Sequence, residues 1–328
     1  MIEFWTAVLG LTIFLYVILD GFDLGIGMLM PMAKSEAERD HMLATIEPVW
    51  DGNETWLVLS ATILFGIFPL TYSTLLSAFY LPLIVMLGAL IFRGVAFEFR
   101  GKSKRTHGLW DGGFIVGSYV ATFIQGMAVG ALVRGLPMSG YHYVGGPLGW
   151  FSPFALLCGA GLCIGYALMG AGWLTYKSQP EVRDLGFLLI PRLLAALLVF
   201  LALIFGLSLS NDLWVLQRWI QMPALMVFPL FGVIACAAML WAVQTRRELL
   251  PFFCSIGIFA AAMGTLAVSF YPYMIPFAIT TTQAAAPAST QSFLFWGAGV
   301  FVLPLTLVYT LTIYFVFKGK VGLEEQGY

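Results

Sequence analysis

Residues 4–30 read FWTAVLGLTIFLYVILDGFDLGIGMLM, and Asp20 and Asp23 are the only charged residues in this run. An α-helix needs about 20 predominantly apolar residues to cross the hydrocarbon core of a bilayer. The run exceeds that length and no basic residue precedes it. We therefore expect a retained transmembrane helix rather than a cleavable signal.

Similar apolar runs recur along the whole chain. Of its 328 residues, 60% are apolar and 10% are charged, whereas an ordinary soluble domain has roughly 25% charged residues. The sequence therefore predicts an all-α integral membrane protein, with residues 1–328 in a single membrane domain of about nine spans. The expected spans lie near 4–30, 54–73, 76–98, 112–134, 151–174, 187–209, 220–243, 251–271 and 292–317. A short turn at Thr71–Ser77 predicts a hairpin between the second and third spans.

The basic residues predict the orientation. Thirteen of the sixteen Lys and Arg residues fall in one set of alternate loops and the C-terminal tail. These are Lys34, Arg39, Arg100, Lys102, Lys104, Arg105, Lys177, Arg183, Arg192, Arg246, Arg247, Lys318 and Lys320. The opposite loops hold only Arg134 and Arg218, with aromatic residues such as Trp150 and Trp214 typical of a membrane interface. Because cytoplasmic loops carry the excess of Lys and Arg, the N-terminus is expected outside and the C-terminus in the cytoplasm.

The first expected span contains an acidic pair beside small residues. A spacing of three places Asp20 and Asp23 on one helical face, and ionisable residues inside a span mark functional sites. Gly21 and Gly25 form a GxxxG pair that, with Gly27, predicts a surface where another helix approaches closely. An alternative is that the glycines break the helix and the aspartates cap the fragment.

A second acidic cluster opens the next span, where residues 50–56 read WDGNETW. Asp51 and Glu54 also fit a capping box, so their local sequence leaves structural and functional interpretations open. Together with Asp20 and Asp23 they are expected in the cytoplasmic half of the membrane. Carboxyl groups gathered on one side favour a proton entry path, because desolvated acids can exchange protons near neutral pH.

Several polar residues further along the chain are expected to support or border this cluster. Arg93 and Glu98 of the third span should lie in the same half, with Arg93 as counter-ion to an acid. The alternative is that Arg93 extends to the lipid headgroups. Asp111 is expected to cap the fourth span, and Gln125 to make an interhelical hydrogen bond.

The sequence gives little support for a haem, metal, disulfide or nucleic-acid site in this chain. The three histidines, His41, His107 and His142, are all expected in loops, so the sequence predicts no histidine-ligated haem in this chain and no metal site; methionine ligation stays open. The four cysteines lie singly in apolar runs and are expected to be reduced. The lack of a basic domain argues against a nucleic-acid partner.

The segments DGFDLGIG at 20–27 and WDGNETW at 50–56 resemble subunit II of the cytochrome bd-type quinol oxidases, including the cyanide-insensitive branch. The resemblance extends along the chain through FYLP at 79–82, FRGVAFEFR at 92–100, LWDG at 109–112 and FYPYMIP at 270–276. These short matches occur in order among the nine expected spans, which makes the set specific.

The resemblance implies a fold of two four-helix bundles, 1–135 and 150–272, plus a peripheral helix at 292–317. It also implies a heterodimer in the bacterial cytoplasmic (inner) membrane with a larger subunit I. In this family subunit I ligates two b-type haems and one d-type haem. The complex oxidises quinol at the outer face and reduces dioxygen to water with protons from the cytoplasm.

The resemblance further assigns proton access to the aspartate of the Trp-Asp-Gly-Asn motif, which is Asp51, flanked here by Trp50 and Asn53. The acidic pair of the first helix corresponds to Asp20 and Asp23. Some members hold a structural quinone, and small single-helix accessory subunits are further candidate partners.

Two other functions fit the same residues. A stand-alone proton-coupled secondary transporter also needs membrane-embedded carboxylates. Against it, the chain shows no convincing inverted repeat, and its acids lie on one side rather than at the midplane. A purely structural scaffold, with Asp51 acting only as a helix cap, is the third interpretation.

Overall fold

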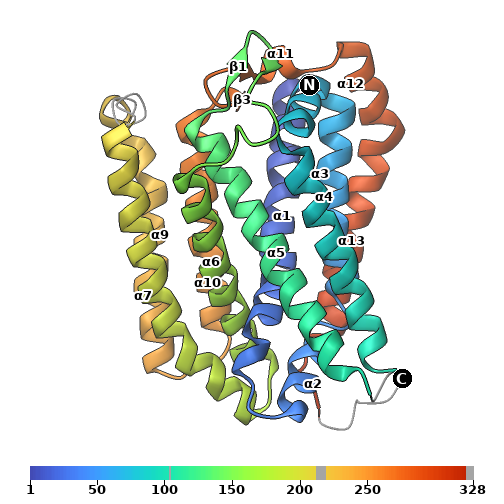
Figure 1. The fold of residues 1–328 in the computed structure, drawn as a ribbon, viewed down its shortest axis with the longest axis vertical. Coiled ribbons are helices and arrows are strands. Elements are labelled where there is room, and N and C mark those ends of the chain that lie inside the picture. The colour runs from blue at the N-terminus through green and yellow to red at the C-terminus, as the bar shows by residue number, and fades with distance from the viewer. Residues whose placement is uncertain (103–104, 212–218, 323–328) are drawn as a thin grey trace.

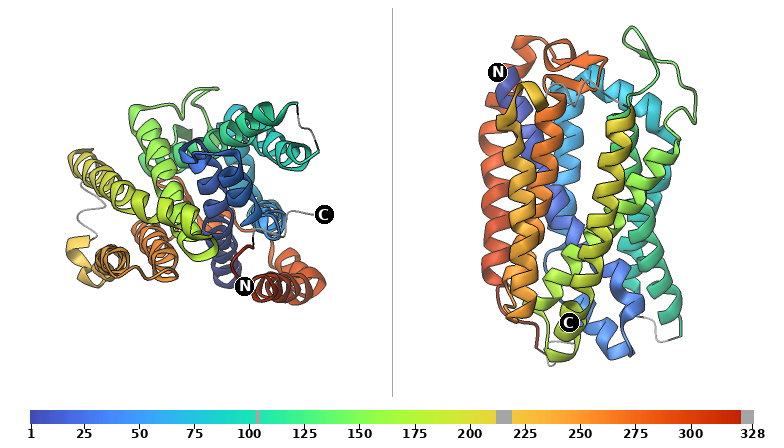
Figure 2. Two further views of the ribbon diagram at one scale, coloured as in Figure 1. Left: turned by 90° about the horizontal axis from the view of Figure 1, so that it is seen from below. Right: turned by 90° about the vertical axis from the view of Figure 1, so that its left-hand side faces the viewer.

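The computed structural model describes residues 1–102, 105–211 and 219–322. Lys104, Trp214 and Arg218, which entered the orientation argument, lie outside this part of the chain. Within it, long helices run side by side along one axis (Figures 1 and 2). The long helices are α1 (Ile2–Leu29), α3 (Trp50–Ile67), α4 (Pro69–Arg100), α5 (His107–Arg134), α6 (Pro153–Lys177), α7 (Pro180–Asn211), α9 (Val227–Gln244), α10 (Leu250–Phe270) and α13 (Val300–Val316).

Short elements connect the long helices. They are η1 (Met30–Met32), α2 (Glu36–Ala44), β1 (Met138–Ser139), β2 (His142–Tyr143), η2 (Pro223–Met226), β3 (Tyr273–Ile275), β4 (Ile279–Thr280), α11 (Thr281–Ala284), α12 (Ala288–Leu294) and the π-helical η3 (Phe295–Gly299). The two antiparallel strand pairs and α11 lie at the end of the molecule where α1 begins, whereas α2 lies at the opposite end (Figure 1). The basic loops predict that the α2 end is cytoplasmic.

Eight helical segments in the described residues are long and apolar enough to cross a membrane. The expected count of about nine also includes α3, which has 18 residues and runs alongside the other helices (Figure 1). Its first turns carry Asp51, Asn53 and Glu54, and these polar residues lower its average hydropathy. The chain is therefore a multi-pass membrane protein, and its orientation stays a prediction.

The turn between the second and third spans lies earlier than expected. The predicted turn at Thr71–Ser77 is wrong, because α3 ends at Ile67 and α4 begins at Pro69. Proline disfavours helical geometry in the residue before it and readily starts a helix, and Phe68, with φ −125° and ψ 58°, separates the two helices. The backbone of α4 then leaves helical geometry at Phe79, three residues before Pro82, which cannot donate a backbone hydrogen bond.

Helix α1 packs against α3, α5 and α6. It is continuous through its glycines, so the alternative in which they break the helix is wrong. A Cβ atom built on Gly25 would lie 2.0 Å from the carbonyl oxygen of Tyr166, and one on Gly27 would lie 2.1 Å from Oγ of Ser118. These clashes confirm the predicted surface of close helix approach, which involves α6 and α5.

Helix α13 occupies the rim of the molecule (Figures 1 and 2). Helix α13 continues from α12 and η3, and together they form the apolar segment Ala288–Val316. Only 6% of the most apolar stretch of this segment is buried. This exposure agrees with the expected peripheral helix. The division of the remaining helices into bundles at 1–135 and 150–272 stays a prediction.

Candidate functional site

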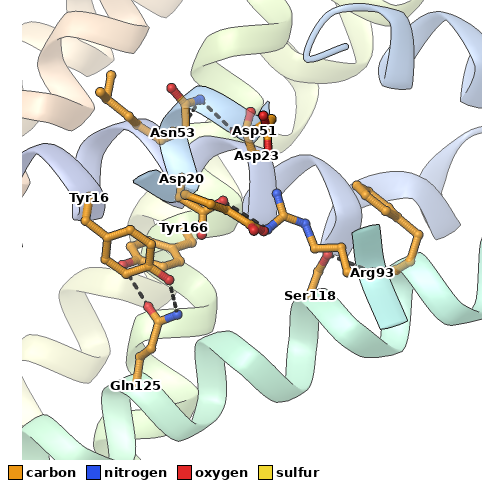
Figure 3. Close-up of polar contacts among 12 residues, drawn as sticks. Tyr16, Asp20, Asp23, Asp51, Asn53, Arg93, Ser118, Gln125 and Tyr166 are labelled. Atoms are coloured by element: carbon orange, nitrogen blue, oxygen red, sulfur yellow. Dashed lines mark hydrogen bonds and ion pairs between the residues drawn. The ribbon is translucent and has the colours of Figure 1, made fainter. Parts of the chain in front are cut away.

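A buried arginine joins two acids at the centre of the helix bundle. The guanidinium of Arg93, from α4, donates through Nη1 to Asp20 Oδ1 at 2.9 Å (Figure 3). The same nitrogen donates to Glu54 Oε1 at 2.8 Å. Its side chain is 1% exposed. The interpretation in which Arg93 extends to the headgroups is therefore wrong, and the three residues bring α1, α3 and α4 together.

The second aspartate of α1 has a different partner. Asn53 Nδ2 donates to Asp23 Oδ2 at 2.7 Å and to the backbone carbonyl of Leu19 at 3.3 Å. Its amide oxygen accepts a hydrogen bond from the Tyr314 hydroxyl at 2.9 Å. Asn53 and Asp23 are both buried. The peripheral helix α13 therefore supplies a side chain to the site, and no local sequence signal marked Tyr314.

A second polar chain begins one helical turn before Asp20, on the same face of α1. Gln125 of α5 donates through Nε2 to the Tyr16 hydroxyl at 2.7 Å, and Tyr166 of α6 donates to Gln125 Oε1 at 3.2 Å (Figure 3). The interhelical hydrogen bond expected of Gln125 is confirmed. Gly21 leaves room for the Tyr166 ring, because a Cβ atom there would lie 2.8 Å from Tyr166 Cε1.

The cluster retains unused hydrogen-bonding capacity. Within the described residues, Oδ2 of Asp20, Oδ1 of Asp23, and Nε and Nη2 of Arg93 have no hydrogen-bond partner. Buried polar atoms are normally satisfied by protein or water. Two acceptors and two donors in one buried cluster can therefore exchange hydrogen bonds with a small proton carrier such as water.

The remaining candidates from the sequence lie at the border of this cluster. Asp51 is exposed at the second position of α3, three residues before Glu54. It makes no side-chain cap bond, so the capping interpretation is wrong: the N-cap position belongs to Val49. The Glu98 side chain is 55% exposed and pairs with Lys102 at 3.7 Å, so the structure does not bring it to Arg93.

Trp50 is half-buried and supports the packing of α3 on α4. Its ring lies 5.3 Å from that of Phe97, and it approaches Gly94. The indole therefore positions the start of α3, which carries the polar residues, but forms no hydrogen bond to the acids among the described residues.

A separate ionic network ties α2 to α4 and α5 at the predicted cytoplasmic end. Arg100 donates to Asp111 through Nε and to Asp40 through Nη1, both at 2.5 Å, and Arg39 lies 3.5 Å from Asp111. The expectation that Asp111 caps a helix is wrong. Because α5 begins four residues earlier, at His107, the carboxylate of Asp111 is free to face α4.

The histidines all lie towards the ends of the molecule. His41 is in α2, His107 begins α5 and His142 is in β2. His41 accepts a hydrogen bond through Nε2 from the Gln179 backbone at 3.1 Å, and burial lowers the pKa of His41 below its ordinary value of 6.5. No group of three or more metal-ligating side chains occurs in the described residues.

A charged cluster enclosed by membrane-spanning helices defines the class: a multi-pass membrane protein with an ionisable site in its interior. Residues 1–317 match the family model described as cytochrome bd terminal oxidase subunit II. The chain therefore belongs to that family, as the motifs at 20–27 and 50–56 predicted. Membership implies a haem-containing complex with a partner subunit I, in the inner membrane, and supports an oxidase subunit over a stand-alone transporter.

Individual relatives agree with the family assignment. The chain is 29% identical to the probable cytochrome oxidase subunit 2 of Haemophilus influenzae, covering 90% of this chain and 85% of that protein. It is 27% identical to the cytochrome bd-I ubiquinol oxidase subunit 2 of Escherichia coli, covering 98% and 95%. The Bacillus subtilis cytochrome bd ubiquinol oxidase subunit 2 is 26% identical, covering 98% and 97%.

The fold has a counterpart among solved structures. The bd oxidase of Geobacillus thermodenitrificans contains a chain that matches with a TM-score of 0.78 at 17% identity, covering 96% of this chain and 98% of that one. At this level of identity the match supports the fold rather than particular site residues.

Proposed function

We propose that this subunit conducts protons from the cytoplasm towards the haem-bearing subunit of a quinol-oxidising complex. The observation that carries the proposal is the single Arg93 guanidinium that joins Asp20 and Glu54 inside the bundle. Burying an unpaired charge costs free energy, and pairing with a guanidinium reduces that cost for an ionised carboxyl group. Arg93 thus allows several carboxyl groups to occupy one membrane depth.

The exposures of the acids supply a direction for the path. Asp51 is exposed and the Glu54 side chain is 27% exposed, whereas Asp20 and Asp23 are fully buried. A proton would therefore enter at Asp51 or Glu54 and pass to the buried pair. Arg93 would hold one carboxylate oxygen of Asp20 and one of Glu54 against the same nitrogen. This keeps the two carboxyl groups close together, which favours proton transfer between them.

The complex would divide its chemistry between its subunits. Membership of the family implies haems in the complex, and the three histidines of this chain lie in α2, at the start of α5 and in β2 rather than in the middle of a long helix. The proposal therefore places two b-type haems and one d-type haem in subunit I, with quinol oxidation at the outer face. The names of the Escherichia coli and Bacillus subtilis relatives support ubiquinol as the electron donor. We also propose that the complex contains a structural quinone and small single-helix accessory subunits.

The proposal is tested by removing single carboxylates from the assembled complex. Asp51→Asn and Asp20→Asn should each lower oxygen consumption per haem by about tenfold or more, because a proton-transfer group is lost. Haem content should be unchanged, since Arg93 keeps Glu54 as a partner. Glu98→Gln is the matched control: it removes a carboxylate from α4 that lies outside the cluster, and it should leave turnover unchanged.

The outcomes separate the interpretations. Full turnover in both aspartate variants would contradict a proton path through these residues. Purification of the wild-type chain alone and without haem would contradict the assignment to an oxidase complex.

A further inference from the structure

Among the membrane-crossing segments found in the described residues, Ala288–Val316 has the smallest buried share, yet one of its side chains reaches the buried site around Asp23. Tyr314 lies near the C-terminal end of α13, and its hydroxyl donates to Asn53 Oδ1 at 2.9 Å. On its other side the Tyr314 ring packs edge-on against Trp173 of α6, with centroids 6.2 Å apart. The side chain is thus held between α3 and α6, although most of α13 is exposed.

The partners of Asn53 determine which way its amide points. The backbone carbonyl of Leu19 can only accept a hydrogen bond, so the amide nitrogen must face α1. The amide oxygen then faces α13, where the Tyr314 hydroxyl donates to it. In this orientation Nδ2 also donates to Asp23 at 2.7 Å. Without the Tyr314 donor, only the contacts to α1 would hold the amide.

The segment that follows α13 fixes this helix to α6. Lys177, which is 5% exposed, donates through Nζ to the backbone carbonyls of Phe317 and of Gly319, the latter at 2.9 Å. The Val321 backbone donates to the Lys177 carbonyl at 3.1 Å. Tyr176 donates to the carbonyl of Lys318 at 3.0 Å. A buried ammonium that binds backbone carbonyls ties residues 317–321 to the end of α6.

Two further contacts reinforce this attachment. Gln179 donates to the Val321 carbonyl at 2.8 Å, and Lys320 pairs with Glu248 at 2.7 Å. Hydrogen bonding to Lys320 lowers the pKa of Glu248, which favours the carboxylate form of this side chain. Residues 317–321 therefore contact both the end of α6 and the loop before α10.

We propose that Tyr314 is a positioning residue for the proton site, fixing the Asn53 amide towards Asp23, and that the attachment of residues 317–321 holds it there. The proposal rests on the proposed proton path and goes beyond it. The peripheral helix then has a defined task, because it orients a donor at a buried acid. Tyr314 acts through Asn53 and itself transfers no proton.

A double-mutant cycle in the purified oxidase complex tests this role. The variants are Tyr314→Phe, Asp23→Asn and the two combined, with oxygen consumption per haem measured in H₂O and D₂O. Tyr314→Phe should lower turnover about fivefold, the effect of losing one hydrogen bond, and should raise the solvent isotope effect. In the Asp23→Asn background it should cause no further loss, because both changes act on one interaction.

Two further variants complete the design. Tyr309→Phe is the matched control, since Tyr309 is on the same helix and 52% exposed; it should leave turnover and the isotope effect unchanged. Lys177→Met should reproduce the Tyr314→Phe defect, and the two changes combined should be no worse than either alone.

The contrary results separate the proton path through Asp23 from the positioning role of Tyr314. Normal turnover in Asp23→Asn would contradict the participation of Asp23 in the proton path. Normal turnover in Tyr314→Phe, with Asp23→Asn impaired, would overturn the positioning role alone. An equal fivefold loss in both backgrounds would also overturn it. So would failure of Tyr314→Phe to assemble while Tyr309→Phe assembles, because the hydroxyl would then serve packing.

Discussion

Arg93 uses one nitrogen, Nη1, to bind both Asp20 and Glu54. Its aliphatic stem and guanidinium are enclosed, and the guanidinium carbon lies 5.7 Å from the centre of the Phe114 ring. A buried ion pair contributes little net stability, but removal of one partner leaves the other charge uncompensated. At the residue scale, replacing one acid of the site by its amide should therefore lower the stability less than replacing Arg93.

Arg93→Gln should lower the stability of the complex by about 3–5 kcal/mol, the range for breaking a buried pair from one side. The expected observation is a lower unfolding temperature and less assembled complex in detergent. Arg192→Gln, at an exposed position of α7, is the control and should change neither. Equal stability of the two variants would contradict a structural requirement for the Arg93 charge.

Local sequence rules identified some members of the site and missed others. The spacing of Asp20 and Asp23 predicted a shared helical face, and Arg93 was expected as a counter-ion because it is a charge inside a span. Tyr314 could not be found in this way, because its contact with Asn53 joins positions 261 residues apart. A single tyrosine in an apolar run carries no sign of such a partner in the sequence.

At the scale of elements, close contact between α1 and α6 places Asp20 beside the Tyr166 ring. A Cβ atom on Gly170 would lie 2.7 Å from the carbonyl carbon of Gly25, so the two backbones touch at these glycines. In membranes such contacts gain packing and permit weak interhelical hydrogen bonds. The small residues of α1 therefore determine how α6 contributes to the site.

Gly25→Leu should prevent this contact, because the added side chain would overlap the α6 backbone, which cannot move aside without disturbing Tyr166. The expected result is loss of assembled complex on gel filtration. Gly10→Leu on the same helix has open space around its Cβ position and should assemble normally. Normal assembly of both variants would contradict the close α1–α6 contact.

The attachment of α2 to the residues before α7 should depend on pH. His41 accepts a hydrogen bond from the Gln179 backbone, which requires a neutral imidazole. Burial lowers the pKa of His41, while the charge of Glu181 acts in the opposite direction. Because the folded-state pKa is depressed, this contribution to stability is present above about pH 6.5 and is lost as the pH falls below it.

The comparison of wild type with His41→Gln measures this dependence. The unfolding temperature of the wild type should fall more steeply between about pH 7 and pH 5.5, because His41 gains a proton in the unfolded state in that range and glutamine cannot. Parallel curves for the two proteins would show that His41 does not control the pH dependence.

The apolar runs predicted which segments are helices. They did not predict where each helix begins and ends, because the boundaries depend on local backbone chemistry. The turn was predicted at Thr71–Ser77 but lies at Phe68. The residue that follows Phe68 is Pro69, and proline disfavours helical geometry in the residue before it. Asp111 was expected at a helix start because it begins an apolar run. Its partner Arg100 belongs to the preceding helix, α4, and that pairing depends on how α4 and α5 pack.

At the scale of the whole molecule, Asp20 and Asp23 lie in the second half of α1, which runs towards the end that carries α2 (Figure 1). Helix α13 contributes Tyr314, which donates to Asn53. Composition alone predicted the membrane class, and the family match supplies the oxidase context. The pairing of Arg93 with an acid was expected, but the particular partners among α1, α3 and α4, and the contact with α13, could not be predicted, because they depend on how distant spans pack. The central claim is that protons pass through this interior.

Proton uptake during a single turnover tests that claim most directly. The fully reduced complex is mixed with oxygen in a weakly buffered solution that contains a pH-sensitive dye, and the rates of oxygen binding and proton uptake are followed together. In Asp20→Asn we expect oxygen binding at the wild-type rate and proton uptake slowed by about tenfold or more. Proton uptake at the wild-type rate in an assembled Asp20→Asn complex would contradict the claim.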